Sequence, residues 1–247
     1  MEEHAHSRTE SLIGTPALQC LRNSAVAVLG IGGVGCYAVE ALARAGIGRL
    51  YLVDGEDIAV SNINRQIHAT TRTVGEAKVE VMARRVQEID PEIQVKTLKC
   101  RITGEELEEL LSDPFDYIID ALDTMTVKIA LACYCHERRI PLISSMGAGN
   151  KLDPTAFVVS DIFQTRQCPL ARVLRRELKK RGVPVLKVVY SEEKPLQSVG
   201  TQVGEEEGEN PEKRTPASIS FVPSTAGLIL AGEVIRDLIG IPERGRA

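Results

Sequence analysis

The sequence predicts an α/β protein whose mainly parallel sheet is doubly wound and covered by helices on both faces. Two observations support this prediction. Short apolar runs alternate with helical segments through the first 150 residues, as parallel strands joined by crossover helices require. The chain of 247 residues is 43% hydrophobic and 26% charged, which is typical of a globular protein with one main core.

The first elements form a strand, helix, strand unit that is Rossmann-like. The run AVAVLG at 25–30 is continuously apolar and too short for a helix, as expected for a strand that a parallel sheet buries on both faces. Residues 35–46 are typical of a helix that Gly46 ends, and RLYLVD at 49–54 is typical of a second strand. The alternation continues with helices at 75–89, 104–111 and 124–138 and strands at 93–98, 115–120 and 141–145.

Beyond residue 150 the alternation becomes less regular. Strands are predicted at 156–161 and 185–190, with a basic helix at 169–181 between them and a closing helix at 224–239. Residues 192–217 are rich in Glu, Gly and Pro and hold few large apolar side chains. Because burial there cannot offset the entropy of ordering, we expect a flexible loop.

Composition argues against several other classes of protein. The N-terminal residues MEEHAHSRTESLIG are polar and mixed in charge, unlike a secretory signal, and no run of about 18 apolar residues predicts a membrane span. We therefore expect a cytoplasmic protein without membrane contact. We expect reduced thiols and no structural zinc site, because no C-x-x-C pair occurs among Cys20, Cys36, Cys100, Cys133, Cys135 and Cys168.

The stretch GIGGVG at 30–35 matches G-x-G-x-x-G between a predicted strand and a predicted helix. In this motif Gly30 permits the tight turn, Gly32 lets a phosphate approach the backbone, and Gly35 lets the helix pack on the strand. The helix N-terminus adds free N–H groups and partial positive charge. Asp54 ends the second strand, where a carboxylate can accept hydrogen bonds from ribose hydroxyls. Alone, these features suit NAD, FAD or ATP equally.

The stretch SNINRQIHAT at 61–70 holds more polar groups than a dinucleotide site needs. Asn62 and Asn64 can bond to sugar and phosphates, and Arg65 offers a planar fork for phosphate oxygens. Lys78 follows in the first turn of the next predicted helix as a second cation. Two fixed cations suit a triphosphate that is attacked at its α-phosphorus, because negative charge develops on the departing pyrophosphate.

Two aspartates stand at the end of the predicted strand at 115–120, in the stretch DALDT. Ligands bind at the carboxyl ends of parallel strands, and Mg²⁺ prefers one or two carboxylates beside phosphate oxygens and water. We favour Asp123 as the magnesium ligand, because Asp120 can instead cap the following turn.

In this order and spacing, GIGGVG, Asp54, SNINRQ, Lys78 and DALD resemble the E1-like adenylating enzymes over the first 150 residues. The resemblance implies a catalytic set of Arg65, Lys78 and Asp123. Arg8 resembles an N-terminal arginine that enters the neighbouring subunit's site, which implies a homodimer. The implied ATP-binding residues are Arg8, Gly30, Gly32, Gly33, Gly35, Asp54, Asn62, Asn64, Arg65, Gln66, Lys78 and Asp123.

Within that superfamily, four further stretches resemble the tRNA threonylcarbamoyladenosine dehydratases, namely NRQIHA, IPLISSMGAGNKLDPT, CPLARVLRREL and FVPSTAGLILAG. They extend the match over nearly the whole chain. The resemblance implies that ATP activates the carboxylate of threonylcarbamoyladenosine at tRNA position 37, beside the anticodon, and that this side chain then closes into a cyclic form. An attacking nitrogen of the same side chain needs no enzyme nucleophile.

The same resemblance implies ATP and Mg²⁺ as cofactors, with a monovalent cation as a further candidate. The implied partners are a tRNA that carries threonylcarbamoyladenosine and, as a candidate, a cysteine desulfurase or sulfur acceptor. Residues 1–160 would form the ATP-binding part, and residues 161–247 an extension for the tRNA within the same structural domain.

A basic segment agrees with a nucleic-acid substrate. From Arg166 to Lys187 there are eight basic residues and one acidic residue, Glu177, in a chain of net charge −4. Such clustering suits a phosphate backbone, whereas a merely solvated helix face rarely carries so large an excess of one sign. The expected tRNA contacts are Arg166, Arg172, Arg175, Arg176, Lys179 and Lys180.

Some roles stay open. Cys168 precedes Pro169 at the start of the basic helix, where a thiol can be a nucleophile or part of an ordinary helix cap. His68 and His136 are candidates for the base of ring closure by residue type alone. Residues 145–155 are expected to line the substrate pocket.

Three other functions compete with this one. An enzyme that activates a ubiquitin-like sulfur carrier would share the ATP site, but such enzymes commonly carry paired C-x-x-C zinc ligands, which this sequence lacks. An NAD-dependent oxidoreductase would leave Arg65, Lys78 and Asp123 unexplained. A non-catalytic adapter would have no use for a complete phosphate-binding set.

Overall fold

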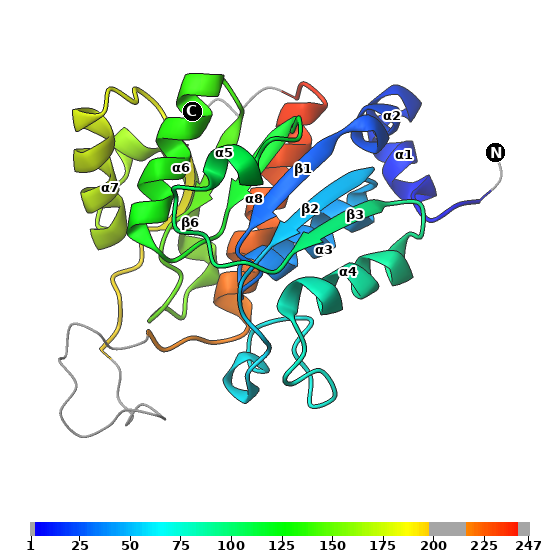
Figure 1. Ribbon diagram of the computed structural model, residues 1–247, viewed down its shortest axis with the longest axis horizontal. Coiled ribbons are helices and arrows are strands. Elements are labelled where there is room, and N and C mark those ends of the chain that lie inside the picture. The colour runs from blue at the N-terminus through cyan, green and yellow to red at the C-terminus, as the bar shows by residue number, and fades with distance from the viewer. Residues whose placement is uncertain (1–2, 198–215, 242–247) are drawn as a thin grey trace.

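The computed structural model describes residues 3–197 and 216–241, and its centre is a seven-stranded sheet (Figure 1). The strands lie in the order β3-β2-β1-β4-β5-β7-β6; β6 is antiparallel to β7, and the other described pairings are parallel. The predicted doubly wound, mainly parallel sheet is confirmed. The bounds are β1 Ala25–Leu29, β2 Arg49–Val53, β3 Gln94–Leu98, β4 Tyr117–Asp120, β5 Leu142–Ser145, β6 Phe157–Asp161 and β7 Lys187–Ser191.

Helices cover both faces of the sheet (Figure 1). α3, α4 and α8 pack on one face, and α5 and α6 on the other, with α7 packed beside α6. Short 3-10 turns are η1 Val60–Asn62, η2 Pro154–Ala156 and η3 Ile162–Gln164. The helix bounds are α1 Ser7–Ile13, α2 Thr15–Asn23, α3 Gly35–Ala45, α4 Lys78–Ile89, α5 Leu107–Leu110, α6 Met125–Arg138, α7 Pro169–Lys180 and α8 Phe221–Leu238.

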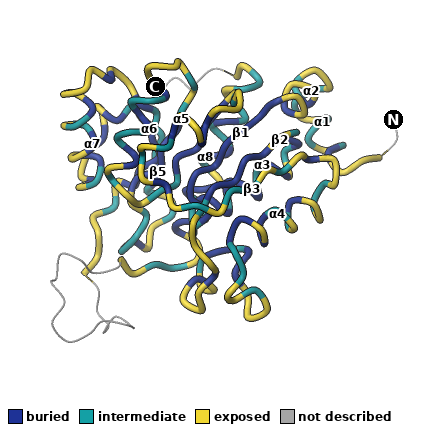
Figure 2. The backbone as a smooth tube through the Cα atoms, in the orientation of Figure 1, coloured by how far each residue is buried: buried dark blue, intermediate teal, exposed yellow. Residues whose placement is uncertain are grey.

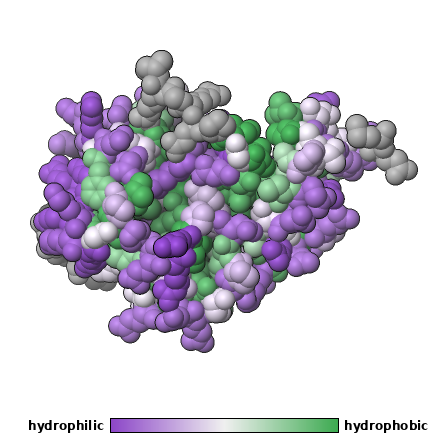
Figure 3. Space-filling model, turned by 90° about the horizontal axis from the view of Figure 1, so that it is seen from above, coloured by the Kyte–Doolittle hydropathy of each residue, from purple (hydrophilic) through white to green (hydrophobic). Residues whose placement is uncertain are grey.

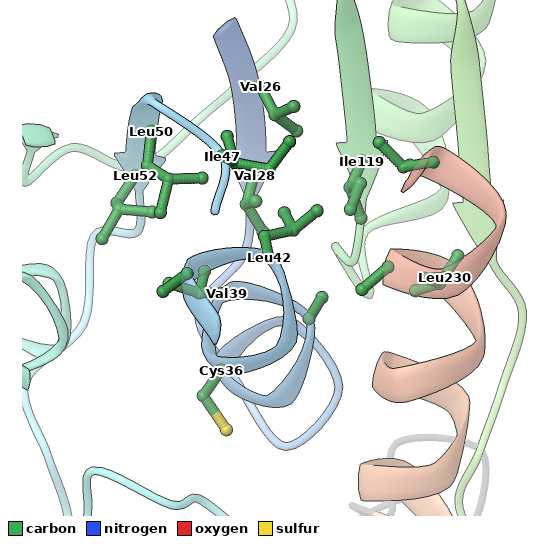
Figure 4. Close-up of a cluster of buried hydrophobic side chains, with 14 of the residues drawn as sticks. Val26, Val28, Cys36, Val39, Leu42, Ile47, Leu50, Leu52, Ile119 and Leu230 are labelled. Carbon is green, nitrogen blue, oxygen red and sulfur yellow. The ribbon is translucent and has the colours of Figure 1, made fainter. Parts of the chain in front are cut away.

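The central strand β1 is the reason both faces need a helical layer. All of its residues are buried (Figure 2), and consecutive side chains of a strand point to opposite faces. Val26 and Val28 pack with Leu42 of α3 and Leu230 of α8 (Figure 4), whereas Leu29 packs with residues of α5 and α6. The continuously apolar sequence of this strand therefore specifies three layers.

The predicted starts of three helices were wrong, each by about three residues. α4 begins at Lys78, because Gly75 takes a left-handed φ of 88° that a helix cannot continue. α5 is limited to Leu107–Leu110, because Gly104 takes a left-handed φ of 103° that a helix cannot continue. α8 begins at Phe221, earlier than the predicted position 224.

The N-terminal helices α1 and α2 have no counterpart among the predicted elements. They have seven and nine residues, too few for a stable helix without tertiary contacts. His6 provides such contacts: its buried imidazole lies 2.8 Å from Asp90 Oδ2 through Nε2 and 3.2 Å from the Arg44 carbonyl oxygen through Nδ1. Local sequence patterns do not contain these long-range partners.

Most of the loop predicted at 192–217, namely residues 198–215, lies outside the described residues. The described residues on either side of it are hydrogen-bonded to the body of the protein. Before it, the N–H of Glu192 donates to the Ala156 carbonyl oxygen at 2.9 Å, and the N–H of Leu196 donates to the Asn150 carbonyl oxygen at 2.7 Å. After it, the N–H of Ala217 donates to Asn150 Oδ1 at 2.8 Å. Within the described part of the chain, none of the helices has the length and apolarity that crossing a bilayer demands.

Candidate active site

The topology of the sheet places the candidate site between β1 and β4. From β1 the chain continues outward to β2 and β3 on one side, and from β4 it continues to β5 on the other. Ligands of open α/β sheets bind at such a switch point, outside the carboxyl ends of the strands. The glycine loop follows β1 and the stretch DALDT follows β4, and these two strands are paired. The two predicted motifs therefore meet at one edge of the sheet.

The glycine loop, residues 30–35, packs directly on the end of β4. A side chain at Gly30 would come within 2.7 Å of the Ala121 carbonyl oxygen, and one at Gly35 within 1.8 Å of the Gly30 carbonyl oxygen. Gly32, by contrast, faces open space, with no atom within 4 Å of an added Cβ. The loop is thus fixed on one side and open at Gly32, where α3 begins to present its N-terminus. A phosphate cradle requires this arrangement.

The Asp54 carboxylate is tied to the glycine loop. One oxygen accepts the N–H of Ile31 at 2.7 Å, and the other accepts the N–H of Glu56 at 2.8 Å. Each oxygen keeps a further lone pair for a ligand. Asp54 therefore lies beside the loop, as expected from its place at the end of β2, while its contact with ribose stays a prediction.

The three amide side chains predicted to bind nucleotide differ in their surroundings. Asn62 is buried, and its Oδ1 accepts the N–H of Ala59 at 3.0 Å, so it shapes the turn η1. Asn64 is exposed, and its Nδ2 donates to the Ser218 carbonyl oxygen at 3.0 Å. Gln66 is buried, and its Oε1 has no hydrogen-bond partner among the described residues. Asn62 therefore acts on the fold of the segment, and an acceptor at Gln66 is left for a ligand or a water.

Arg65 lies against the glycine loop. Its Cγ is 3.3 Å from the position of a Cβ added at Gly33. Its Nη1 donates to the Ser61 carbonyl oxygen at 2.8 Å and to Asn64 Oδ1 at 2.9 Å. Among the described residues both hydrogen bonds of the guanidinium use this one nitrogen, so the rest of the fork can bind an anion.

Lys78 is the first residue of α4 and is only 3% exposed. Its ammonium pairs with the exposed carboxylate of Glu56, which closely follows Asp54. Burial, and next the charge of Lys78, lower the pKa of the His68 imidazole to about 4. Lys78 is therefore a desolvated cation. It stands where the segment between β2 and α4, which contains Arg65, ends.

Asp120 and Asp123 have opposite environments. Asp120 is buried, and its carboxylate accepts hydrogen bonds from Lys128 Nζ at 2.9 Å, Ser144 Oγ at 2.5 Å and the Leu122 N–H at 3.1 Å. These bonds join the ends of β4 and β5 and cap the turn after β4, as the sequence suggested for Asp120. Asp123 is exposed, so of the two carboxylates it is the one that a ligand can reach.

The Asp123 carboxylate fits a magnesium ion that is held mainly by phosphates. No group of three or more His, Cys, Asp or Glu side chains suited to a metal occurs within residues 3–197 and 216–241. Mg²⁺ bound beside a nucleotide takes only one or two carboxylates together with phosphate oxygens and water. The single exposed carboxylate of Asp123 agrees with that requirement.

Residues 216–223, the stem of α8, also border the site, and sequence reasoning missed them. Pro223 in the first turn of α8 lies 3.3 Å from a Cβ added at Gly33, and Ser218 accepts the bond from Asn64. On the other side, a Cβ added at Gly149 would come within 2.5 Å of Pro216. The available signal was the stretch SFVPS, in which a proline within the first helical turn fixes the start of a helix.

Of the candidates for base and nucleophile, His68 and Cys168 are buried and His136 is exposed. His68 is 3% exposed, and neither ring nitrogen has a partner among the described residues. Cys168 is 9% exposed and packs with apolar residues of α7 such as Leu174, which favours a structural role over a nucleophilic one. His136 is exposed on α6.

The predicted tRNA contacts lie on and beside α7, at the end of the molecule away from α1 (Figure 1). Seen from above, this end is largely hydrophilic (Figure 3). Arg175 differs from the others, because its Nη1 donates to the Thr165 hydroxyl and carbonyl oxygens and so supports the fold. The predicted contacts that are exposed are Arg166, Arg172, Arg176, Lys179 and Lys180.

Glu177 reduces the free positive charge of this surface. Its carboxylate contacts Arg181 at 2.7 Å, Lys180 at 3.0 Å and Arg176 at 3.3 Å. The hydrogen bond from Arg181, followed by that from Lys180, lowers the pKa of Glu177 to about 2. The acid therefore stays ionised and holds these three cations as a group.

Arg8 lies far from the glycine loop of its own chain. It is exposed on α1, which packs through His6 at the ends of α3 and α4 that are opposite the loop. A cavity of about 490 Å³ opens there as well, between α1, α2 and Asp90. The predicted role of Arg8 therefore requires a second copy of the chain.

Comparison with known proteins agrees with this geometry. The tRNA threonylcarbamoyladenosine dehydratase of Bacillus subtilis is 47% identical over 241 residues, which cover 96% of this chain and 95% of that protein. The Escherichia coli protein of the same name is 46% identical over 171 residues, 69% of this chain and 64% of its own. A crystal structure of E. coli tRNA N6-threonylcarbamoyladenosine dehydratase in complex with ATP has a TM-score of 0.85 at 35% identity and covers 96% of this chain and 94% of that chain.

A family model supports the same conclusion over nearly the full length. The model of the ThiF family matches residues 6–246, a range that includes the glycine loop, both predicted cations, Asp123 and the basic helix. By this match and by its near-full-length relatives, the chain belongs to the ThiF family.

Proposed function

We propose that this chain is an ATP-dependent tRNA threonylcarbamoyladenosine dehydratase, which adenylates the carboxylate of the modified nucleoside and lets it close into a cyclic form. The observation that carries the proposal is 47% identity to such an enzyme over 96% of the chain. The arrangement of the site supports it, because Asp54, Arg65 and an open glycine loop lie together at the switch point of the sheet.

The first step joins the substrate carboxylate to the α-phosphorus. A carboxylate oxygen attacks, the bond to the bridging oxygen of the β-phosphate breaks, and pyrophosphate leaves. The open backbone at Gly32 and the N-terminus of α3 hold phosphate oxygens, and Asp54 accepts from the ribose. Arg65 and Lys78 offset the charge that develops on the leaving group.

The second step is intramolecular. The acyl carbon now carries AMP as a good leaving group, and a nitrogen of the same side chain attacks it and loses a proton. The AMP carries away the carboxylate oxygen, so the nucleoside loses one water molecule in total. Proximity supplies much of the rate, which agrees with the buried position of Cys168.

Magnesium is the expected cofactor of the first step, and Asp123 is the residue that would hold it. Bound there, the ion would neutralise phosphate charge. This chain's contribution is the exposed Asp123 carboxylate, set in place by the buried bonds of Asp120.

The exposed basic residues of α7 are the proposed contacts for tRNA phosphates. Reversing the charges of Arg172, Arg176 and Lys179 should weaken tRNA binding at least about tenfold and lower its dependence on salt, because fewer counterions are released. ATP affinity should stay unchanged. Filter binding over a salt series measures both effects, and tRNA affinity equal to that of the wild type would contradict this surface.

The central test incubates the protein with ATP, Mg²⁺ and threonylcarbamoylated tRNA, followed by mass analysis of the nucleosides. We expect loss of one water molecule, together with exchange of label between pyrophosphate and ATP. Arg65→Ala and Lys78→Ala should each lower the exchange rate about 100-fold or more. Lys96→Ala should not, because Lys96 lies on the edge strand β3 and its ammonium pairs with Asp113. Exchange that depends on a small sulfur-carrier protein instead of tRNA would support the alternative activating function.

The resemblance further suggests a homodimer in which Arg8 enters the neighbouring site. It also suggests a cysteine desulfurase or sulfur acceptor as a partner and a monovalent cation as an activator. The exposure of Arg8 on α1, opposite the glycine loop of its own chain, supports the first of these.

A further inference from the structure

We infer that Asn150 and Asn64 are positioning residues for Arg65, joined by one chain of hydrogen bonds from the segment after β5 to the nucleotide side of the site. The inference rests on the proposed function, in which Arg65 meets the triphosphate. It changes the role expected for Asn64, from binding the nucleotide to holding the residue that does.

The first link of the chain is the Asn64 amide, which is bonded to protein at both ends. Its Oδ1 accepts from Arg65 Nη1 at 2.9 Å, and its Nδ2 donates to the Ser218 carbonyl oxygen at 3.0 Å. Arginine loses much rotamer freedom when it is held in one orientation. An amide that is itself anchored supplies that restraint, so the position of Ser218 helps to set the direction of the guanidinium.

The second link is Asn150, which holds the residue next to Ser218. The N–H of Asn150 donates to the Ala217 carbonyl oxygen at 2.7 Å, and its Oδ1 accepts the Ala217 N–H at 2.8 Å. Its own carbonyl oxygen accepts the Leu196 N–H at 2.7 Å. Three segments of the chain are therefore joined at one residue, through two backbone bonds and one side-chain bond. Asn150 can do this because its φ is 57°, a conformation that asparagine tolerates better than most residues.

Close packing of Pro216 and Pro223 fixes the position of the segment that carries Ala217 and Ser218. Pro216 lies so near Gly149 that an added Cβ would approach it within 2.5 Å, and Pro223 is 3.3 Å from a Cβ added at Gly33. The stem of α8 thus contacts the segment after β5 at one end and the glycine loop at the other. A shift of Ala217 would be transmitted to the support of Arg65.

This arrangement predicts for which ligands the binding affinity depends on the hydrogen bonds of Asn150 and Asn64. If Arg65 meets the pyrophosphate portion, its orientation matters for ATP and for pyrophosphate release. It matters much less for AMP, which lacks that portion. Damage that merely loosens the fold would instead weaken ATP and AMP alike.

The test replaces Asn150 by glycine, which accepts the positive φ without strain and removes the side chain whose Oδ1 accepts the Ala217 N–H, while both backbone bonds of residue 150 stay possible. Calorimetric affinity for ATP should fall about five- to tenfold, as expected for one hydrogen bond, with AMP affinity within about twofold. Asn150→Asp keeps an acceptor and should restore ATP affinity. Arg139→Gly is the matched control, because Arg139 also has a positive φ, 56°, but ends α6 away from the links.

A double-mutant cycle shows whether the effect passes through Arg65. In an Arg65→Ala background, Asn150→Gly should cause no further loss of ATP affinity or exchange rate. Equal losses for ATP and AMP, or an undiminished loss in the Arg65→Ala background, would overturn the inference. Asn64→Leu, at an exposed position, should give the same ATP-selective loss and replaces Asn150→Gly if that variant melts early. If the wild-type protein binds ATP without exchanging pyrophosphate, the proposed function is refuted instead. The ATP and AMP affinities of the variants would still test whether Asn150 and Asn64 position Arg65.

Discussion

Gly32 and Gly35 belong to the same loop, yet an added methyl group would meet open space at the first and a carbonyl oxygen at 1.8 Å at the second. Gly32→Ala should therefore leave the free energy of unfolding within about 1 kcal/mol, since Gly32 has no positive φ. It should lower ATP affinity about tenfold or more by filling the phosphate approach. Gly35→Ala should cost at least about 3 kcal/mol of stability. Denaturant unfolding and calorimetry distinguish the two; ATP binding unaffected by Gly32→Ala would contradict the cradle.

His68 makes a prediction about pH. Its folded pKa of about 4 is below the value of 6.5 for a free imidazole, so between these values the unfolded chain binds more protons. Stability should rise with pH across this window and be lost as pH falls through it, by up to about 3 kcal/mol. His68→Leu should flatten the dependence of melting temperature on pH between 4 and 6.5. His136→Leu, at an exposed histidine, should leave it in place.

Among the elements, α8 contains two glycines with different tasks. A Cβ at Gly227 would lie 2.2 Å from the Val34 carbonyl oxygen of the glycine loop, while one at Gly232 meets nothing within 4 Å. Gly227→Ala should push α8 away and destabilise the protein by about 2 kcal/mol or more. It should also weaken ATP binding, because Pro223 then leaves Gly33.

Gly232→Ala serves as the control for that substitution. It should stabilise the helix by about 0.5–1 kcal/mol, since alanine is the better helix former. Thermal unfolding of both variants measures the difference. Equal effects at the two positions would mean that α8 does not approach the glycine loop as described.

The sequence predicts those elements whose cause is local. Continuously apolar runs such as 25–30 predict buried strands because few other structures bury every side chain, and Gly46 ends α3 where it takes a left-handed φ of 95°. α1 and α2 are held by the bond between His6 and Asp90, two residues far apart in sequence. No local pattern encodes such a partner, so these helices could not be predicted.

For the site the same distinction applies. Motif spacing predicts Gly32, Asp54 and Arg65, because the order of strands alone brings the ends of β1, β2 and β4 to one edge. Ser218 and Pro223 reach that edge only because α8 packs beside α3, which is a tertiary contact. Their contribution to the site could therefore not be read from sequence.

For the whole molecule, the distance of Arg8 from its own glycine loop makes a prediction about assembly. If Arg8 acts in the site of a partner, inactive Arg8→Ala and Lys78→Ala chains should restore part of the activity when mixed and refolded together. A mixed dimer then has one site with both residues intact. Activity near one quarter of the wild-type level is expected from random pairing of the two chains. No recovery, in a mixture shown to form mixed dimers, would exclude a shared site.

The last described helix also completes the core, and this has a consequence for biosynthesis. While α8 is still inside the ribosome, the apolar sides of β1 and α3 that it later covers are exposed on the nascent chain. The glycine loop is translated early, yet Pro223 reaches Gly33 only after translation has passed the start of α8. Chains stalled before Phe221 should therefore bind chaperones and fail to retain ATP, because the proposed ATP site is complete only after α8 has been synthesised.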